Sequence, residues 1–131
     1  MSEMVSQYFS AKEFACRHCG KLPEMTEHVR LFLEALDTLR ERYNGPLVLS
    51  SGYRCKDHPI EKAKPGGPGP HSTGCAADIL CSGQKAFGVL QDAMIEDLFE
   101  GIGVNQRGDH AKRFIHVDIS PKRKELSLWS Y

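Results

Sequence analysis

The sequence predicts an α+β fold in which a small antiparallel sheet carries two main helices packed on it. Two segments, 26–43 and 82–101, repeat apolar residues at the three- and four-residue steps of an amphipathic helix. Two short apolar runs, 47–51 and 76–81, have the length of strands. Residues 114–119 alternate between aromatic or polar side chains and aliphatic ones, as a strand with two different faces does.

Length and charge indicate one domain that spans residues 1–131. The chain is long enough to bury an ordinary core without disulfide bonds. Its 17 basic and 17 acidic residues give a formal net charge of zero, which disfavours general attraction to nucleic acids or anionic membranes. No apolar run approaches the ~20 residues that span a bilayer. We expect a monomer with neither a nucleic acid nor a membrane as partner.

The N-terminal residues and the cysteines indicate a cytoplasmic origin. Residues 1–14 lack a basic region followed by an apolar one, so we expect synthesis in the cytoplasm without a signal peptide. Five cysteines are an odd number, which argues against a complete disulfide framework. They fit thiols that stay reduced or bind a metal.

The chain is predicted to begin with an irregular arm and then a helix. Residues 1–25 hold few periodic apolar positions. Thr26 is a suitable N-cap, and Asn44-Gly45-Pro46 ends the helix because proline cannot continue it. The apolar positions of this helix are Val29, Leu33, Leu36, Leu39 and Tyr43.

The first predicted strand leads to polar residues and then to a loop. Residues 47–51 run directly into Gly52, Tyr53 and Arg54. The segment 64–70 is rich in proline and glycine, a composition that neither a helix nor a strand tolerates. We expect this loop to form a rim that shapes a cleft.

The second half of the chain is predicted to combine strands with one further helix. After the strand 76–81, Ser82 caps a helix that ends at Gly101. Residues 102–104 are expected to form a brief third strand, and 114–119 the last one. The apolar stripe predicted for this helix consists of Phe87, Leu90, Met94 and Leu98.

The C-terminal residues form a small basic cluster followed by aromatic side chains. We expect Lys122-Arg123-Lys124 to lie in a solvated turn. Trp129 and Tyr131 are expected to pack the C-terminus onto the sheet.

Three polar residues occupy positions where a sheet normally holds apolar ones. His71 precedes the second strand, Asp78 lies within it, and His116 lies within the last strand. Two imidazole nitrogens and one carboxylate oxygen suit zinc, and they leave a fourth tetrahedral position for water, as in catalytic sites. Gly74 lets the chain turn sharply between the first two residues. The alternative is that each residue is an ordinary hydrogen-bonded side chain.

A second metal site is predicted from two chelating pairs. Cys16 and Cys19 are separated by two residues, and so are Cys55 and His58. Together they have the composition of a structural Cys3His zinc site, which would anchor the arm. In the alternatives, His18 replaces Cys19, or the cysteines are ordinary buried thiols.

Three motifs in the chain occur together in a known family. They are Ser51-Gly52-Tyr53-Arg54, His71-Ser72-Thr73-Gly74-Cys75-Ala76-Ala77-Asp78 and Phe114-Ile115-His116-Val117-Asp118. In these motifs the chain resembles the M15 family of zinc peptidases, which includes D-alanyl-D-alanine carboxypeptidases and phage endolysins. The likeness is greatest to the small M15A-type C-terminal domain proteins. It implies a hedgehog/DD-peptidase-like fold, with a catalytic zinc ion bound by His71, Asp78 and His116.

The resemblance also implies a reaction and residues that bind substrate. Arg54 matches the arginine with which the family binds or polarises the substrate, and its planar donors suit a D-alanine carboxylate or a developing oxyanion. A structural salt bridge is the alternative role for Arg54. Ser72 is expected to donate a hydrogen bond nearby. The implied reaction is hydrolysis of peptide bonds in the peptidoglycan stem, with zinc as the Lewis acid.

The chain departs from the family pattern at the general base. Relatives carry a carboxylate three residues before the final histidine ligand or a histidine two residues before it, whereas this chain has Arg113 and Phe114 there. The remaining candidates are Asp118, Asp109 and His110. We favour Asp118, because two residues along a strand span about 7 Å, within reach of a zinc-bound water. As the alternative, Asp118 orients a ligand imidazole.

The leading hypothesis is a zinc-dependent peptidase, a carboxypeptidase or an endopeptidase, whose partner is the peptidoglycan stem peptide. Without a signal peptide, it would act at the cell wall after lysis or phage-assisted release. One alternative is a non-catalytic binding module for cell-wall or protein ligands, because hedgehog signalling domains resemble this fold, retain a similar zinc site and act by binding partners. A nucleic-acid-binding zinc module over residues 16–58 is the third hypothesis, which the neutral charge disfavours.

Overall fold

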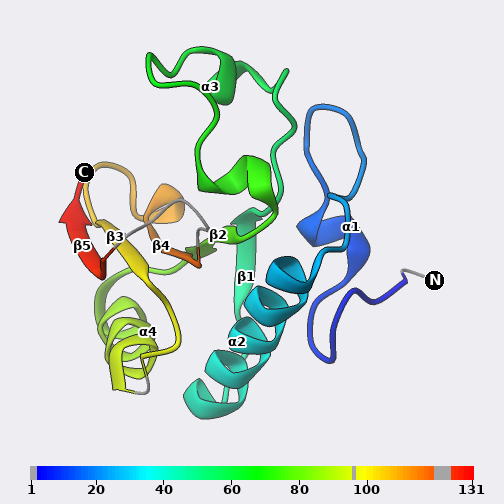
Figure 1. Ribbon diagram of the computed structural model, residues 1–131. Helices are drawn as coiled ribbons and strands as arrows, with labels where there is room; N and C mark the ends of the chain where they lie inside the picture. The colour runs from blue at the N-terminus through cyan, green and yellow to red at the C-terminus, as the bar shows by residue number, and fades with distance from the viewer. Residues whose placement is uncertain (1–2, 96, 120–124) are drawn as a thin grey trace.

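The computed structural model describes residues 3–95, 97–119 and 125–131. Within these residues, five strands form one sheet in the order β1-β2-β4-β3-β5 (Figure 1). Figure 1 shows α2 and α4 on the same side of this sheet, so the fold is α+β, as predicted. The elements are α1 (Ala11–Phe14), α2 (Glu27–Tyr43), β1 (Val48–Ser51), α3 (Pro59–Lys62), η1 (Pro70–Thr73), β2 (Ala76–Leu80), α4 (Gly83–Ile95), β3 (Gly101–Asn105), η2 (His110–Lys112), β4 (Phe114–Asp118) and β5 (Ser127–Ser130), where η1 and η2 are short 3₁₀ helices.

The helix α2 begins and ends where the sequence predicts. Thr26 is the N-cap, and its hydroxyl accepts a hydrogen bond from the backbone N–H of Val29 at 3.3 Å. Asn44 ends the helix in the left-handed conformation, with a φ of 56°. The inward face buries Val29, Phe32, Leu33, Leu36 and Leu39 in the hydrophobic core.

All four predicted strands are present, each within one residue of its expected bounds. A further strand, β5, was not predicted as a strand and pairs with β3 in parallel, so the sheet is mostly rather than wholly antiparallel. The predicted packing of the C-terminal aromatic residues is confirmed. The ring of Trp129 lies 5.3 Å from that of His116, and the ring of Tyr131 lies 5.2 Å from that of Phe114.

The apolar stripe predicted for α4 is only half right, because Leu90 and Leu98 pack against the core and the other two residues do not. The helix buries Ala86, Val89 and Ala93, whereas Phe87 is 70% exposed and Met94 is 49% exposed. Small side chains face inward because α4 packs on both α2 and β4, and they allow these elements to approach closely.

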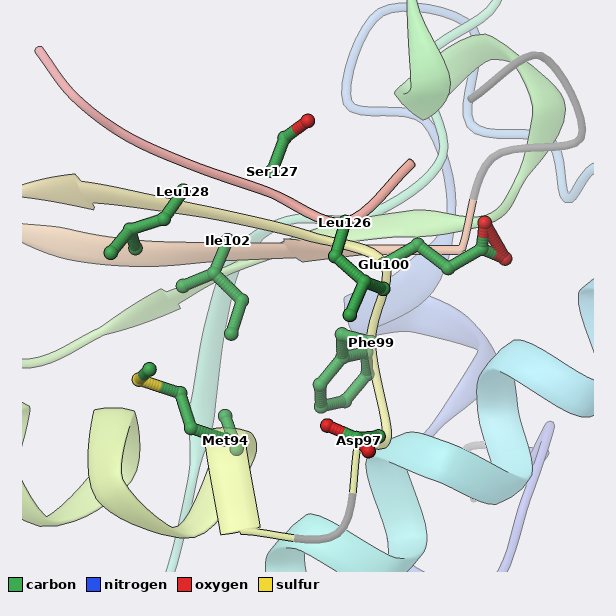
Figure 2. A pocket seen from close by; sticks show the side chains of 9 residues that line it. Met94, Asp97, Phe99, Glu100, Ile102, Leu126, Ser127 and Leu128 are labelled. Atoms are coloured by element: carbon green, nitrogen blue, oxygen red, sulfur yellow. The ribbon is translucent and has the colours of Figure 1, made fainter. Parts of the chain in front are cut away.

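The end of α4 also differs from the prediction. The helix ends at Ile95, and Gly101 is the first residue of β3 rather than the end of the helix. Figure 2 shows the region between these elements, where Met94, Phe99 and Leu126 line a small pocket of about 180 Å³.

The arm contributes more to the core than its sequence predicts. It contains the short helix α1, which begins with a capping box between Ser10 and Glu13. Phe9 and Phe14 are fully buried in the core, although their spacing follows no helix or strand period. The backbone carbonyl of Phe14 accepts a hydrogen bond from Tyr53 N at 2.9 Å, so the arm is bonded to the segment that follows β1.

The predicted loop is present, but a short helix that was not predicted precedes it. His58 caps α3, and residues 64–69 form neither helix nor strand. Pro68 and Gly69 of this loop line a pocket of about 470 Å³, as expected of a rim. The basic cluster Lys122-Arg123-Lys124 lies outside the described residues. Among the residues that are described, none of the helices has the length and apolar character needed to cross a membrane.

Candidate metal centre

The structure brings together the three predicted ligands His71, Asp78 and His116. They come from η1, β2 and β4, and all three side chains are buried. Asp78 Oδ1 lies 3.3 Å from His71 Nε2 and 3.0 Å from His116 Nδ1. Two imidazole nitrogens and one carboxylate oxygen therefore converge on one point.

Local structure explains why residues distant in the sequence meet. Asp78 and His116 are direct partners in the antiparallel ladder of β2 and β4, so their side chains project from the same face of the sheet. Gly74 ends η1 in the left-handed conformation, with a φ of 78°, and turns the chain from His71 into β2, as its position in the sequence predicts.

The remaining ring nitrogen of each histidine is held by a different acceptor. His71 Nδ1 lies 2.7 Å from the backbone carbonyl oxygen of Gly52, to which it donates. His116 Nε2 lies 2.7 Å from Asp118 Oδ2 and donates to that carboxylate. Each ring is thereby fixed in the tautomer whose free nitrogen faces Asp78, the arrangement that metal-binding histidines have.

Burial and hydrogen bonding set the protonation of the three groups. Burial lowers the pKa of His71, against the opposing effect of its hydrogen bond to Asp78. Burial also acts to lower the pKa of His116, but hydrogen bonds to Asp118 and Asp78 outweigh it and raise the pKa. For Asp78, burial acts to raise the pKa, and the two imidazoles, which donate to the carboxylate when they are protonated, overcome this and hold it well below its usual range. Asp78 is therefore a carboxylate at neutral pH.

The donor set fits a zinc ion. The three candidate ligand atoms lie within 4.8 Å of one another, and all can be unprotonated acceptors, as metal ligands must be. Three protein ligands leave one tetrahedral position for water or substrate, which is typical of catalytic zinc sites.

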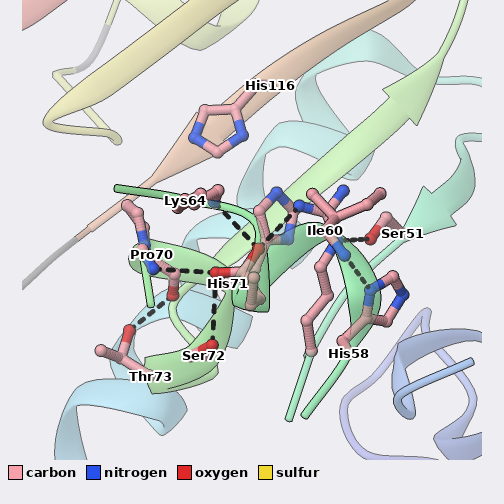
Figure 3. Close-up of polar contacts among 12 residues, drawn as sticks. Ser51, His58, Ile60, Lys64, Pro70, His71, Ser72, Thr73 and His116 are labelled. Atoms are coloured by element: carbon pink, nitrogen blue, oxygen red, sulfur yellow. Dashed lines mark hydrogen bonds and ion pairs between the residues drawn. The ribbon is translucent and has the colours of Figure 1, made fainter. Parts of the chain in front are cut away.

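Arg54, which is partly buried, and the buried Glu61 form a second polar group beside the ligands. Arg54 Nη2 donates to Asp78 Oδ2 at 3.3 Å, and Nη1 donates to Glu61 Oε2 at 3.1 Å. Glu61 also accepts hydrogen bonds from Lys64, from Ser72 and from the backbone N–H of Gly69; Figure 3 shows Lys64 and Ser72 grouped near His71. Burial acts to raise the pKa of Glu61, but these donors lower it to about 2. Glu61 is 1% exposed and is the site residue that sequence reasoning missed.

Comparison with known families assigns the chain to one of them. The family described as Peptidase M15 matches residues 7–118 of this chain. The chain belongs to the peptidase M15 family. Searches of curated proteins and of solved structures give no match.

Membership of the peptidase M15 family agrees with the site geometry. The matched residues include all three candidate zinc ligands, and peptidases of this family depend on zinc. Family membership implies a metallopeptidase, and it does not favour the alternative of a non-catalytic binding module.

The three candidates for the general base differ in position. Asp118 is fully buried and bonded to the ring nitrogen of His116 that faces away from Asp78. This contact matches the alternative in which Asp118 orients a ligand imidazole. Asp109 and His110 are exposed before β4, where Asp109 caps η2, which begins at His110, by accepting a hydrogen bond from Ala111 N.

The structure brings together only part of the second predicted metal site. Cys16, Cys19 and Cys55 place their sulfur atoms within 4.8 Å of one another, but His58 does not belong to this group. His58 Nδ1 instead accepts a hydrogen bond from Ile60 N at 3.2 Å and caps α3 (Figure 3). Of the predicted Cys3His set, the structure therefore brings together the three thiols and leaves His58 outside the group.

Proposed function

We propose that the protein is a zinc metallopeptidase that hydrolyses D-alanine-containing peptide bonds in peptidoglycan stem peptides. The observation that carries this proposal is the convergence of His71 Nε2, Asp78 Oδ1 and His116 Nδ1 in a chain of the peptidase M15 family. The substrate class rests on the resemblance of the three sequence motifs to D-alanyl-D-alanine carboxypeptidases and endolysins.

The surrounding residues keep the ligands in place. The carbonyl of Gly52 fixes the ring of His71, and Arg54 binds one oxygen of Asp78 so that the other faces both imidazoles. When bound, zinc supplies a Lewis acid that polarises the scissile carbonyl and lowers the pKa of a water molecule.

Arg54 retains donors for the substrate. A guanidinium group carries five N–H bonds. In Arg54, Nε donates to Ser51 Oγ, Nη1 to Glu61 and Nη2 to Asp78, and each Nη carries a second N–H. We assign these second N–H groups to the terminal carboxylate of the stem peptide or to the oxyanion that develops during attack.

We assign the stem peptide to a pocket of about 470 Å³ that is lined by chain neighbours of Arg54 and of His71. It is lined by Tyr53 and Cys55, which flank Arg54 in the chain, and by Ser72 and Thr73 of η1. Ser72 donates to Glu61 Oε1 at 3.3 Å, and its oxygen can accept a hydrogen bond from a substrate amide.

We assign Asp118 to orient His116 rather than to take the proton from water. The N–H at His116 Nε2 donates to Asp118, which keeps Nδ1 available to the ion. Of the candidates from the sequence, this leaves Asp109 and His110 as proton acceptors.

The experiment that tests the function is mass spectrometry of peptidoglycan sacculi digested with zinc-loaded protein. We expect release of D-alanine or a cut beside it, abolished by a chelator and restored by zinc. The variant His116→Ala should lose the zinc ion of this site and all activity, whereas the matched control His28→Ala, an exposed position on α2, should keep both. Intact stem peptides after treatment with fully zinc-loaded protein would refute the proposal, and cuts only at bonds without D-alanine would refute the substrate class.

A further inference from the structure

We propose that Cys16, Cys19 and Cys55 form a second, structural metal site that takes zinc through three thiolates. This site is separate from the proposed catalytic centre and uses none of its ligands. It joins the N-terminal arm to the segment that follows β1, which carries Arg54.

The sulfur atoms are already close enough to share one ion. They lie within 4.8 Å of one another. Tetrahedral zinc with Zn–S bonds of ~2.3 Å places its sulfur ligands ~3.8 Å apart, so small rotations of the side chains would complete the set. Cys16 is buried while Cys19 is exposed, which leaves the site open to solvent on one side.

Backbone hydrogen bonds prepare Cys16 to be a thiolate. The backbone N–H of Cys55 donates to Cys16 Sγ at 3.3 Å. The backbone N–H groups of Cys19 and His18 also donate to this sulfur. Such donors stabilise a negatively charged sulfur, and a thiolate is the form that binds metal.

The chain turns tightly between the first two cysteines. Cys16 O accepts a hydrogen bond from Gly20 N at 2.8 Å, and Cys16 N donates to Lys21 O at 2.9 Å. Gly20 has a φ of 75°, a left-handed conformation in which a larger residue would be strained. The turn therefore directs both thiols toward Cys55 rather than away from each other.

The two segments that the site would join already touch each other, and the segment after β1 also touches the catalytic centre. Tyr53 N donates to Phe14 O in the arm, and Arg54 N donates to His71 O in η1. An ion on the three cysteines would fix the residue next to Arg54 and hold that arginine beside Asp78.

Metal analysis separates this site from the catalytic one. Protein purified under reducing conditions should bind two zinc ions per chain. Cys19→Ser and Cys55→Ser should each bind one, and His116→Ala should bind one and retain the cysteine site. The control Cys81→Ala, which changes a buried cysteine outside the cluster, should still bind two. The variant His58→Ala should also bind two, because that ring caps α3.

Cobalt provides a readout that does not depend on activity. Wild-type protein and His116→Ala loaded with Co²⁺ should both show the near-ultraviolet absorption of thiolate-to-cobalt charge transfer, and Cys55→Ser should lose it. Treatment of the folded wild-type protein with a mercurial thiol reagent should release one of its two zinc ions. A reduced wild-type protein that binds one zinc ion and shows no charge-transfer band would overturn the proposal while leaving the catalytic site intact. Loss of the second ion in His58→Ala would overturn the three-thiolate ligand set.

Discussion

Gly101 lies directly opposite Asp118 in the ladder between β3 and β4, and a Cβ atom at Gly101 would lie 2.5 Å from Asp118 Oδ1. The carboxylate that holds the ring of His116 therefore occupies the space that any other residue at position 101 would need. The orientation of one zinc ligand thus depends on the absence of a side chain on a neighbouring strand.

Substitution Gly101→Ala should weaken zinc binding without changing any ligand. The added methyl group would displace Asp118 from His116, and loss of such a supporting contact lowers metal affinity by about 10–100-fold. The control Gly66→Ala lies in a loop where a Cβ meets nothing within 4 Å, so its affinity should equal that of the wild type. Competition titration with a chromophoric chelator measures the zinc affinity of the two variants and of the wild type. Equal affinities for all three proteins would show that Asp118 does not tune the site.

The role of Asp118 can be separated from that of a general base. We expect Asp118→Ala to lose zinc affinity by about 10–100-fold, because the ring of His116 is no longer held. A variant that removes the base should instead keep zinc and lose turnover, and we expect this of Asp109→Ala or His110→Ala. Turnover is compared at full zinc occupancy. If Asp118→Ala alone binds zinc normally and is inactive, Asp118 is the base.

Arg54→Lys should lower kcat/KM by about tenfold or more while the zinc content stays at the wild-type value. Lysine keeps the positive charge near Asp78 and Glu61 but lacks the planar, bidentate donors that suit a carboxylate. The control Arg30→Lys changes an exposed residue of α2 and should be neutral. Kinetics on a synthetic stem peptide would measure the change, and an unaltered kcat/KM would assign Arg54 a structural role alone.

Glu61→Ala should destabilise the protein by about 3 kcal/mol, because it leaves the buried charge of Arg54 with one partner fewer. Urea denaturation measures the free energy of unfolding, and Glu34→Ala on the exposed face of α2 should change it by less than about 0.5 kcal/mol.

The lowered pKa of Glu61 also predicts how the stability of the protein depends on pH. The pKa of Glu61 is lowered to about 2, so its stabilisation is complete above its unfolded pKa of ~4.3 and is lost as the pH falls toward 2. Over that range, Glu61→Gln should lose less stability than the wild type. Parallel acid-unfolding curves would contradict the proposed ion pair.

Zinc affinity should fall as the pH falls through the pKa of His116. That pKa is raised in the metal-free protein, so a proton competes with zinc, and affinity should drop by about tenfold per pH unit below it. Asp118→Asn removes one group that raises this pKa, so the break in the plot of affinity against pH should move to lower pH. An unchanged break would show that Asp118 does not control the protonation of His116.

Periodicity in the sequence was sufficient to place α2, and short apolar or alternating segments placed the four predicted strands, although β2 and β4 are buried on both faces. It placed α4 but misjudged part of its inward face, where the buried positions include the small residues Ala86 and Ala93 and the larger Phe87 and Met94 face solvent. A prediction from hydrophobicity places large apolar side chains on the inward face of a helix, but close packing between helices requires small ones there.

The zinc ligands could be predicted, but their surroundings could not. His71, Asp78 and His116 lie in motifs with fixed spacing, so their chemistry is visible in the sequence. Glu61 shows no such signal, because its partners come from a loop, a 3₁₀ helix and the segment after β1, which meet only in the folded chain. For the same reason, the sequence left two roles open for Asp118.

The arm also protects the edge of the sheet. β1 is the terminal strand, α1 packs against it, and Arg17 Nη2 donates to the carbonyl of Leu49 at 3.2 Å. Unpaired strand edges act as templates on which other chains add strands. A chain shortened to start at Lys21 would expose this edge, and it should form higher-order aggregates at concentrations at which the intact chain stays dispersed.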